Sequence, residues 1–117
     1  MTMTTKEVLK IAVDALDSKK ALDLQIIKIA ELSVIAEYFV ICTGSSTTQI
    51  KALADEVEFK LREAGNPPLR LEGYQSGNWV VVDFGCIIVH VFHPEMREFY
   101  NLERLWADGE KVEADSI

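Results

Sequence analysis

The sequence predicts a single domain of the α/β class (α+β), with a mixed sheet of about five strands and helices packed mainly on one side of it. Its 117 residues are enough for one such domain and too few for a cofactor domain plus a substrate domain. Apolar residues make up 49% of the chain, as in ordinary globular proteins. Helical periods alternate with short runs of β-branched and aromatic residues, in the order helix, two strands, helix, three strands, helix.

The first half of the chain is expected to form a helix, two strands and a helix, over residues 5–17, 22–29, 38–43 and from Ser45 or Ser46 to Gly65. Thr4 and Glu7 have the spacing of a capping box at the start of the first helix. The run over residues 38–43 is apolar throughout, which is typical of a strand buried on both faces. Two prolines follow Gly65 and mark the end of the second helix.

The second half is expected to form three strands and a last helix, over residues 69–73, 79–84, 87–92 and from Pro94 onward. Proline suits the first turn of a helix, because its missing N–H is not needed there. The buried stripe of this helix is expected to consist of Phe99, Leu102, Leu105 and Trp106. From Gly109 the chain is acidic and short of apolar residues, so its end is expected to fray.

Charge and cysteine content narrow the functional class. Twelve Lys and Arg against 19 Asp and Glu give a net charge of −7. This balance disfavours direct binding to nucleic acid and favours a basic protein as partner. Cys42 and Cys86 form no CxxC pair, so we expect neither a disulfide nor a zinc site, and a reducing compartment. No apolar run approaches the roughly 20 residues that span a bilayer, and no signal segment is recognisable, so a bacterial-type cytoplasm is expected and no membrane.

The hairpin over residues 79–92 allows a sharper prediction, because strand pairing fixes which side chains share a face. With a two-residue turn at Gly85 and Cys86, one face is wholly apolar and belongs in the core: Val80, Val82, Phe84, Ile87, Val89 and Val91. The other face carries Trp79, Val81, Asp83, Ile88, His90 and Phe92. Aromatic side chains interrupted by a few polar groups are typical of a protein-binding patch. The alternative is that the last helix covers this face and its residues only pack.

Enzyme chemistry is the alternative class. Gly44 and the two serines after it could contact a phosphate, but no P-loop or dinucleotide motif is present. Metal-dependent nucleotidyl transfer would combine Ser45 with two close carboxylates, whereas residues 69–73 supply only Glu72, and Asp83 lies one strand further on. A helix N-cap made by Ser45 or Ser46 is the favoured interpretation.

Other candidate side chains favour no chemistry. Cys86 and His90 do not face one another in the proposed hairpin, so a nucleophile–base pair is not expected. His90 and His93 make no metal site by themselves. Arg97, Tyr100 and Arg104 can share one side of the last helix, either as a solvated face or as the rim of the hairpin patch.

An ordered set of segments resembles the ribosomal silencing factor S family, also called the Iojap-related family: Tyr38–Ile41, Thr43–Ser46, Glu72–Gly73, Trp79–Gly85, Ile88–Phe92, Arg97–Tyr100 and Leu102–Trp106. The resemblance implies one domain over residues 1–108, followed by an acidic tail over residues 109–117. It also implies a fold like a degenerate nucleotidyltransferase without activity. No catalytic residue, metal or cofactor is therefore expected.

The resemblance further implies a partner and a function. The family binds protein fourteen of the large ribosomal subunit and keeps the small subunit from docking when nutrients are scarce. Carried over by position, its surface motif corresponds to Trp79, Asp83, His90, Arg97, Tyr100 and Glu103, which overlaps the hairpin patch. The chain departs from the family pattern at Cys86, where an acid is usual. A homodimer formed by the free protein through the same aromatic surface is a further hypothesis.

Overall fold

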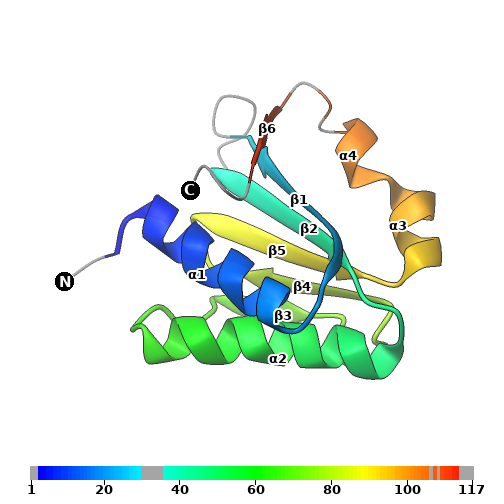
Figure 1. The fold of residues 1–117 in the computed structure, drawn as a ribbon, viewed down its shortest axis with the longest axis horizontal. Helices are drawn as coiled ribbons and strands as arrows, with labels where there is room; N and C mark the ends of the chain where they lie inside the picture. Colours follow the sequence, from blue (N-terminus) through cyan, green and yellow to red (C-terminus); the bar gives the residue numbers. More distant parts are fainter. Residues whose placement is uncertain (1–2, 30–35, 106, 108, 114–117) are drawn as a thin grey trace.

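The computed structural model describes residues 3–29, 36–105, 107 and 109–113, which build a mixed sheet with two long helices on one face and two short helices at one end (Figure 1). In chain order the elements are α1 (Thr5–Ser18), β1 (Leu22–Lys28), β2 (Tyr38–Thr43), α2 (Thr47–Glu63), β3 (Arg70–Glu72), β4 (Trp79–Asp83), β5 (Ile87–Phe92), α3 (Pro94–Tyr100), α4 (Leu102–Leu105) and β6 (Glu110–Val112). The strand order is β3-β4-β5-β2-β1-β6. β2 and β5 run parallel, and the other neighbours are antiparallel. The predicted class is confirmed, with six strands where about five were expected.

α1 and α2 cover one face of the sheet and build the larger part of the core (Figure 1). The predicted capping box is present, because the Thr4 hydroxyl accepts from the Glu7 N–H at 3.2 Å and the Glu7 carboxylate accepts from the Thr4 N–H at 3.3 Å. Ser46 caps α2, accepting from the Gln49 N–H at 3.1 Å. Side chains of β2, β4 and β5 meet the apolar stripes of both helices. As predicted, all six residues of β2 are buried.

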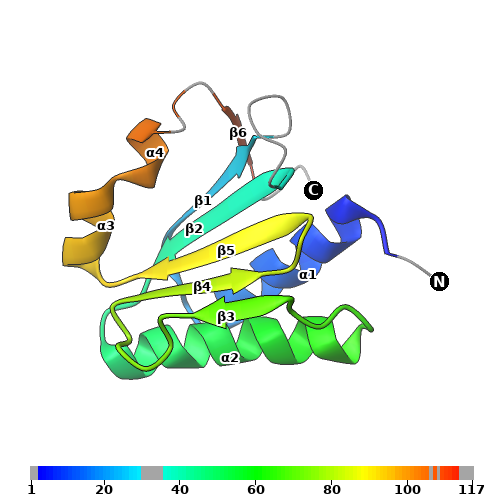
Figure 2. The ribbon, with the colours of Figure 1, turned by 180° about the vertical axis from the view of Figure 1, so that it is seen from behind.

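A smaller apolar cluster lies on the opposite face, and α3 and α4 stand at the end of the sheet where β5 finishes (Figure 2). Its buried members are Ile27, Ile29, Ala36, Phe39, Ile41, Ile88, Phe92 and Leu102, with Trp79, Val81 and Met96 packed against them. α1 and α2 therefore cover one face of the sheet, whereas the opposite face carries only this smaller cluster.

Two expectations for the last third of the chain are wrong. The last helix is not continuous: α3 ends at Tyr100, Asn101 after it adopts the left-handed conformation (φ 45°, ψ 61°), and α4 begins at Leu102. Phe99 lies in α3, none of whose residues is buried, and it is 79% exposed, so it does not belong to the buried stripe, whereas Leu102 of α4 is buried as expected. The side chains of Leu105 and Trp106 lie outside the described residues.

The second wrong expectation concerns the acidic end. Residues 110–112 are not frayed but form β6, which pairs with β1 through its backbone. Backbone pairing does not require apolar side chains, which explains why the polar segment gave no strand signal. None of the helices in the described ranges has both the length and the apolar character that a bilayer-spanning helix needs.

Candidate protein-binding surface

The β4–β5 hairpin has the predicted register. Trp79 pairs with Phe92, Val81 with His90, and Asp83 with Ile88, so their side chains share the face opposite α1 and α2. The turn closes with a hydrogen bond from the Phe84 N–H to the Ile87 carbonyl oxygen at 3.0 Å. The other face of the hairpin joins the main core, as its apolar composition predicted.

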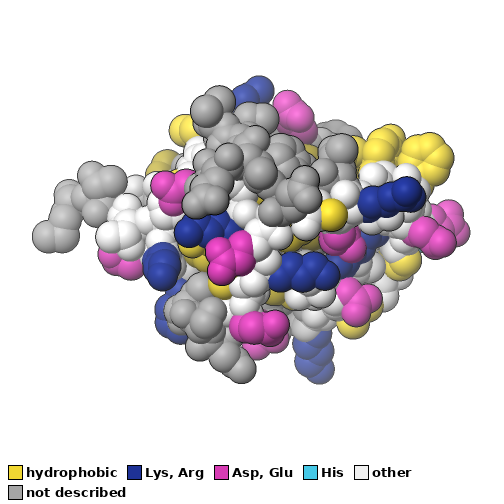
Figure 3. Space-filling view, turned by 90° about the horizontal axis from the view of Figure 1, so that it is seen from above, with side chains coloured by type: hydrophobic (Ala, Val, Ile, Leu, Met, Phe, Trp, Pro, Cys, Tyr) yellow, Lys and Arg dark blue, Asp and Glu magenta, His cyan; other side chains and the backbone are white. Residues whose placement is uncertain are grey.

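Trp79 is the centre of an aromatic cluster. Its indole stacks on Phe92, with ring centroids 4.9 Å apart and an angle of 23° between the planes. Tyr100 of α3 lies over the indole at 4.6 Å, and Phe99 meets the Tyr100 ring edge-on at 5.1 Å. Trp79 is half-buried, Tyr100 is 47% exposed, and hydrophobic side chains gather at the end of the molecule that carries α3 (Figure 3). Within this cluster Phe92 is buried, whereas Tyr100 and Phe99 are accessible to a partner.

His90 lies beneath this cluster and does not reach the surface. Its Nδ1 accepts a hydrogen bond from the Trp79 indole N–H at 3.1 Å, and its ring meets Phe39 edge-on at 4.8 Å. Burial leaves it 6% exposed and lowers its pKa from 6.5 to about 4, so the ring is neutral at neutral pH. The expectation that this face is an exposed patch therefore fails on β5, because Ile88, His90 and Phe92 are all buried. His90 supports Trp79 from below.

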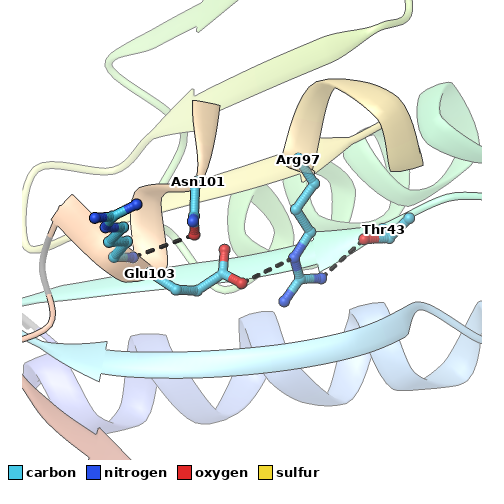
Figure 4. Close-up of polar contacts among 5 residues, drawn as sticks. Thr43, Arg97, Asn101 and Glu103 are labelled. Atoms are coloured by element: carbon cyan, nitrogen blue, oxygen red, sulfur yellow. Dashed lines mark hydrogen bonds and ion pairs between the residues drawn. The ribbon is translucent and has the colours of Figure 1, made fainter. Parts of the chain in front are cut away.

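Arg97 and Glu103 form a polar cluster with Thr43 at the end of β2. The Arg97 Nη1 donates to the Thr43 hydroxyl at 2.8 Å, and its Nε donates to the Glu103 carboxylate at 3.4 Å (Figure 4). The Arg97 side chain is 12% exposed, and Thr43 is buried at the end of β2. Burial raises the pKa of the neighbouring Cys42 thiol to about 12, against the opposing charge of Arg97, so this thiol stays protonated.

Asp83 stands apart from the other five motif residues. It lies four residues along β4 from Trp79, which corresponds to about 13 Å of extended strand. One carboxylate oxygen accepts from the Gly85 N–H at 2.8 Å, and the other lies 3.7 Å from an Arg70 guanidinium nitrogen. Asp83 therefore stabilises the turn of the hairpin, at the far end of the face from the aromatic cluster.

The residues that nucleotidyl transfer would need are not brought together. Ser45 follows β2 beyond Thr43, which aligns across β5 with Trp79, whereas Asp83 aligns with the opposite end of β2. Ser46 is engaged as the N-cap of α2, as predicted. Within the described ranges, no three His, Cys, Asp or Glu side chains are grouped as a metal ion would require. The arrangement offers contact surface and hydrogen bonds.

Cys86 and His90 do not form a nucleophile–base pair. Cys86 lies in the turn, and its pKa is raised by partial burial, which works against thiolate formation. His90 lies across from Val81 and gives its accepting nitrogen to Trp79. Direct hydrogen-bond contact is what activation of a thiol would require.

Two residues of this surface were missed from the sequence. Phe99 was placed in the buried stripe because the helical period continues through it, but α3 buries none of its residues. Thr43 gave no signal, since its partner Arg97 lies 54 residues away. Asn adopts a positive φ more readily than most residues, as Asn101 does between α3 and α4. Nothing in the sequence marked a helix break at this position.

Comparisons with known proteins identify the family of the chain. A family model described as "Ribosomal silencing factor during starvation" matches residues 2–117. The chain is 42% identical over 115 residues to a protein of Halalkalibacterium halodurans named ribosomal silencing factor RsfS, covering 98% of both chains. It is 33% identical over 97 residues to a mouse protein named mitochondrial assembly of ribosomal large subunit protein 1, covering 80% of this chain and 42% of the mouse chain.

A solved structure shares the fold as well as the sequence. A crystal structure of a protein from Chromobacterium violaceum superposes with a TM-score of 0.88 at 39% identity, covering 95% of this chain and 92% of that one. The family match over residues 2–117 and the similarity to these relatives show that the chain is a member of the ribosomal silencing factor family.

Proposed function

We propose that this chain represses translation by binding protein fourteen of the large ribosomal subunit. By occupying that surface it blocks joining of the small subunit during starvation or stationary phase. The observation that carries the proposal is the pair formed by Trp79 of the hairpin and the exposed Tyr100 of α3, whose ring centroids lie 4.6 Å apart. No chemical reaction is required, because occupancy of the joining surface is sufficient.

The packing of Trp79 supports its role as an anchor. Binding energy in protein interfaces concentrates in a few aromatic residues that are held in place before the partner arrives. Phe92 stacks beneath the indole and His90 accepts its N–H, so little conformational freedom is left to lose on binding. Tyr100 adds accessible aromatic area above it. Arg97 and Glu103 flank this pair, and Asp83 is proposed as a more distant rim contact.

The charge of the chain supports a basic protein partner. A net charge of −7 would speed encounter with a basic ribosomal protein, and it would oppose contact with the neighbouring rRNA. A relative from mouse carries a name that refers to the large ribosomal subunit, which favours that subunit as the target. We place this action in the cytoplasm. Occupying most large subunits at cellular concentrations requires an affinity on the order of micromolar or better.

Cosedimentation with purified large ribosomal subunits, washed at high salt, tests this proposal. The wild-type chain should pellet with large subunits, and Tyr100→Ala should lower the affinity by about 30-fold or more, the loss expected for an aromatic anchor. Phe59→Ala is the matched control, since Phe59 is 53% exposed but lies on α2, on the other face of the sheet. Equal binding by wild type and Tyr100→Ala would contradict the assignment of the surface.

Light scattering distinguishes partner binding from self-association. If the free chain forms a homodimer through the same aromatic surface, its molecular mass should fall to that of the monomer in Tyr100→Ala. In that case the ribosomal partner and the second copy should compete. A dimer that persists in Tyr100→Ala would place self-association on another surface.

A further inference from the structure

We infer that Thr43, Arg97 and Glu103 form a clamp that positions Tyr100 over Trp79. This inference rests on the proposed function, and it assigns Arg97 and Glu103 a role different from direct contact with the ribosome. They act in binding as positioning residues, together with Thr43, which lies outside the surface motif.

The need for a clamp follows from how weakly α3 is anchored by apolar contacts. None of its seven residues is buried. Met96 is partly buried against the smaller apolar cluster, and Tyr100 rests on Trp79. A short helix with so little buried apolar area is not held in one orientation by the hydrophobic effect alone. Its direction must therefore depend strongly on specific polar contacts.

Arg97 supplies such contacts on both sides of the helix break. Its guanidinium donates to Thr43 of β2 at 2.8 Å and to Glu103 of α4 at 3.4 Å (Figure 4). Its backbone oxygen accepts from the Asn101 N–H at 2.9 Å, where the chain leaves α3. Tyr100 lies between Arg97 and this break, three residues along the helix from Arg97. One side chain thus ties the sheet, α3 and α4 around the residue that forms the top of the aromatic cluster.

Burial distinguishes positioning from partner contact. Thr43 is 5% exposed, so a docking protein cannot reach its hydroxyl in this conformation. One carboxylate oxygen of Glu103 is buried and has no hydrogen-bond partner among the described residues, while the other receives the Arg97 Nε–H. The Glu103 side chain is 29% exposed as a whole, and its carboxylate is engaged by Arg97. Thr43 can therefore influence a partner only through the placement of α3.

Thr43 gives a clean test, because two substitutions separate its hydroxyl from its shape. Thr43→Val keeps the β-branched side chain and removes the acceptor for Arg97, whereas Thr43→Ser keeps the acceptor. Thr4→Ala serves as a control for general destabilisation, because it removes the N-cap of α1 on the other face of the sheet. Each variant is compared by amide hydrogen exchange of residues 94–101 and by affinity for purified large ribosomal subunits.

We expect the α3 amides of the Thr43→Val variant to exchange with solvent faster than those of the wild type. This variant should also bind large subunits about tenfold more weakly, the effect of losing one hydrogen bond to a charged group. Thr43→Ser and Thr4→Ala should match the wild type in both measurements. Unchanged exchange in Thr43→Val would overturn the clamp. Faster exchange with unchanged binding would overturn its role in positioning the surface. If the wild-type chain itself fails to bind, the proposed function and the role in binding both fall, while the exchange data still decide whether the clamp holds α3.

Discussion

The indole N–H of Trp79 donates a hydrogen bond to Nδ1 of His90 across 3.1 Å, from one strand of the hairpin to the next. Because Nδ1 accepts, the neutral imidazole carries its proton on Nε2. Protonating the ring would destroy the acceptor for Trp79. The buried histidine and the accessible indole are therefore one unit, in which the protonation state of His90 determines whether Trp79 keeps its partner.

The stability of the chain should depend on pH through His90. The pKa of the folded imidazole is about 4, below its ordinary value of 6.5. Between these values the unfolded state binds the proton and the folded state does not, so stability falls as pH drops from 6.5 to 4. Above pH 6.5 the group has no effect, and below pH 4 its contribution is constant. The loss is at most about 3 kcal/mol.

Urea denaturation at several pH values measures this loss. His90→Asn is the informative variant, since its amide oxygen can accept the indole N–H and does not titrate in this range. Its free energy of unfolding should fall less than that of the wild type between pH 7 and pH 4. Parallel curves for the two proteins would show that the pKa of His90 is not depressed in the folded state.

Trp79 should contribute to binding by its contact area as well as by its hydrogen bond. Trp79→Ala is expected to lower the affinity for large ribosomal subunits by about 30-fold or more, as for other central aromatic residues in interfaces. Trp79→Phe should retain the stack on Phe92, lose the hydrogen bond to His90, and show an intermediate loss. Circular dichroism of both variants checks that the fold is intact. Binding by folded Trp79→Ala at the wild-type level would remove Trp79 from the surface.

Variants of Asp83 distinguish a structural role in the hairpin turn from a contact with the partner. Its carboxylate accepts from the Gly85 N–H, so Asp83→Ala should lower the free energy of unfolding by about 1 kcal/mol, whereas Asp83→Asn keeps an acceptor. If Asp83 also faces a basic partner, Asp83→Asn should slow association with large subunits several-fold at low salt, with little change in dissociation. Stopped-flow binding at two salt concentrations measures this. An association rate equal to that of the wild type would leave Asp83 with its role in the turn alone.

Gly73 lies where the backbone after β3 passes close to the backbone of Trp79 in β4. Its φ is +79°, and a Cβ atom there would overlap the carbonyl oxygen of Trp79. Gly73→Ala should therefore cost about 3 kcal/mol or more, because both the backbone and its neighbour would have to move. Gly65→Ala is the matched control: its φ is +89° and nothing lies within 4 Å of the added atom, so only the conformational cost of about 1 kcal/mol remains. Equal losses in thermal denaturation would refute the close approach.

Local sequence signals predicted the parts of the fold that depend on neighbouring residues. The two-residue turn at Gly85 and Cys86 fixed the register of the hairpin, because one residue of slip would reverse every side chain. The caps at Thr4 and Ser46 were recognisable because capping depends on residues three positions apart. The same reasoning identified Trp79 and His90 as neighbours on one face.

Contacts between distant segments were not predictable in this way. His90 is buried by tertiary packing around its strand, which alternation along that strand does not report. The break at Asn101 interrupts a continuous apolar period, and the hydrogen bond between Thr43 and Arg97 joins segments far apart in the sequence. These contacts determine which residues of the candidate surface face outward and which support them from below.

Subunit joining in vitro is the most direct measurement of the central claim. Large and small ribosomal subunits are mixed with increasing amounts of the chain, and joined ribosomes are followed by light scattering. We expect the wild-type chain to suppress joining in proportion to its occupancy of the large subunit, and Tyr100→Ala to leave joining unchanged at the same concentrations. Full joining of large subunits that are saturated with the wild-type chain would contradict steric occlusion.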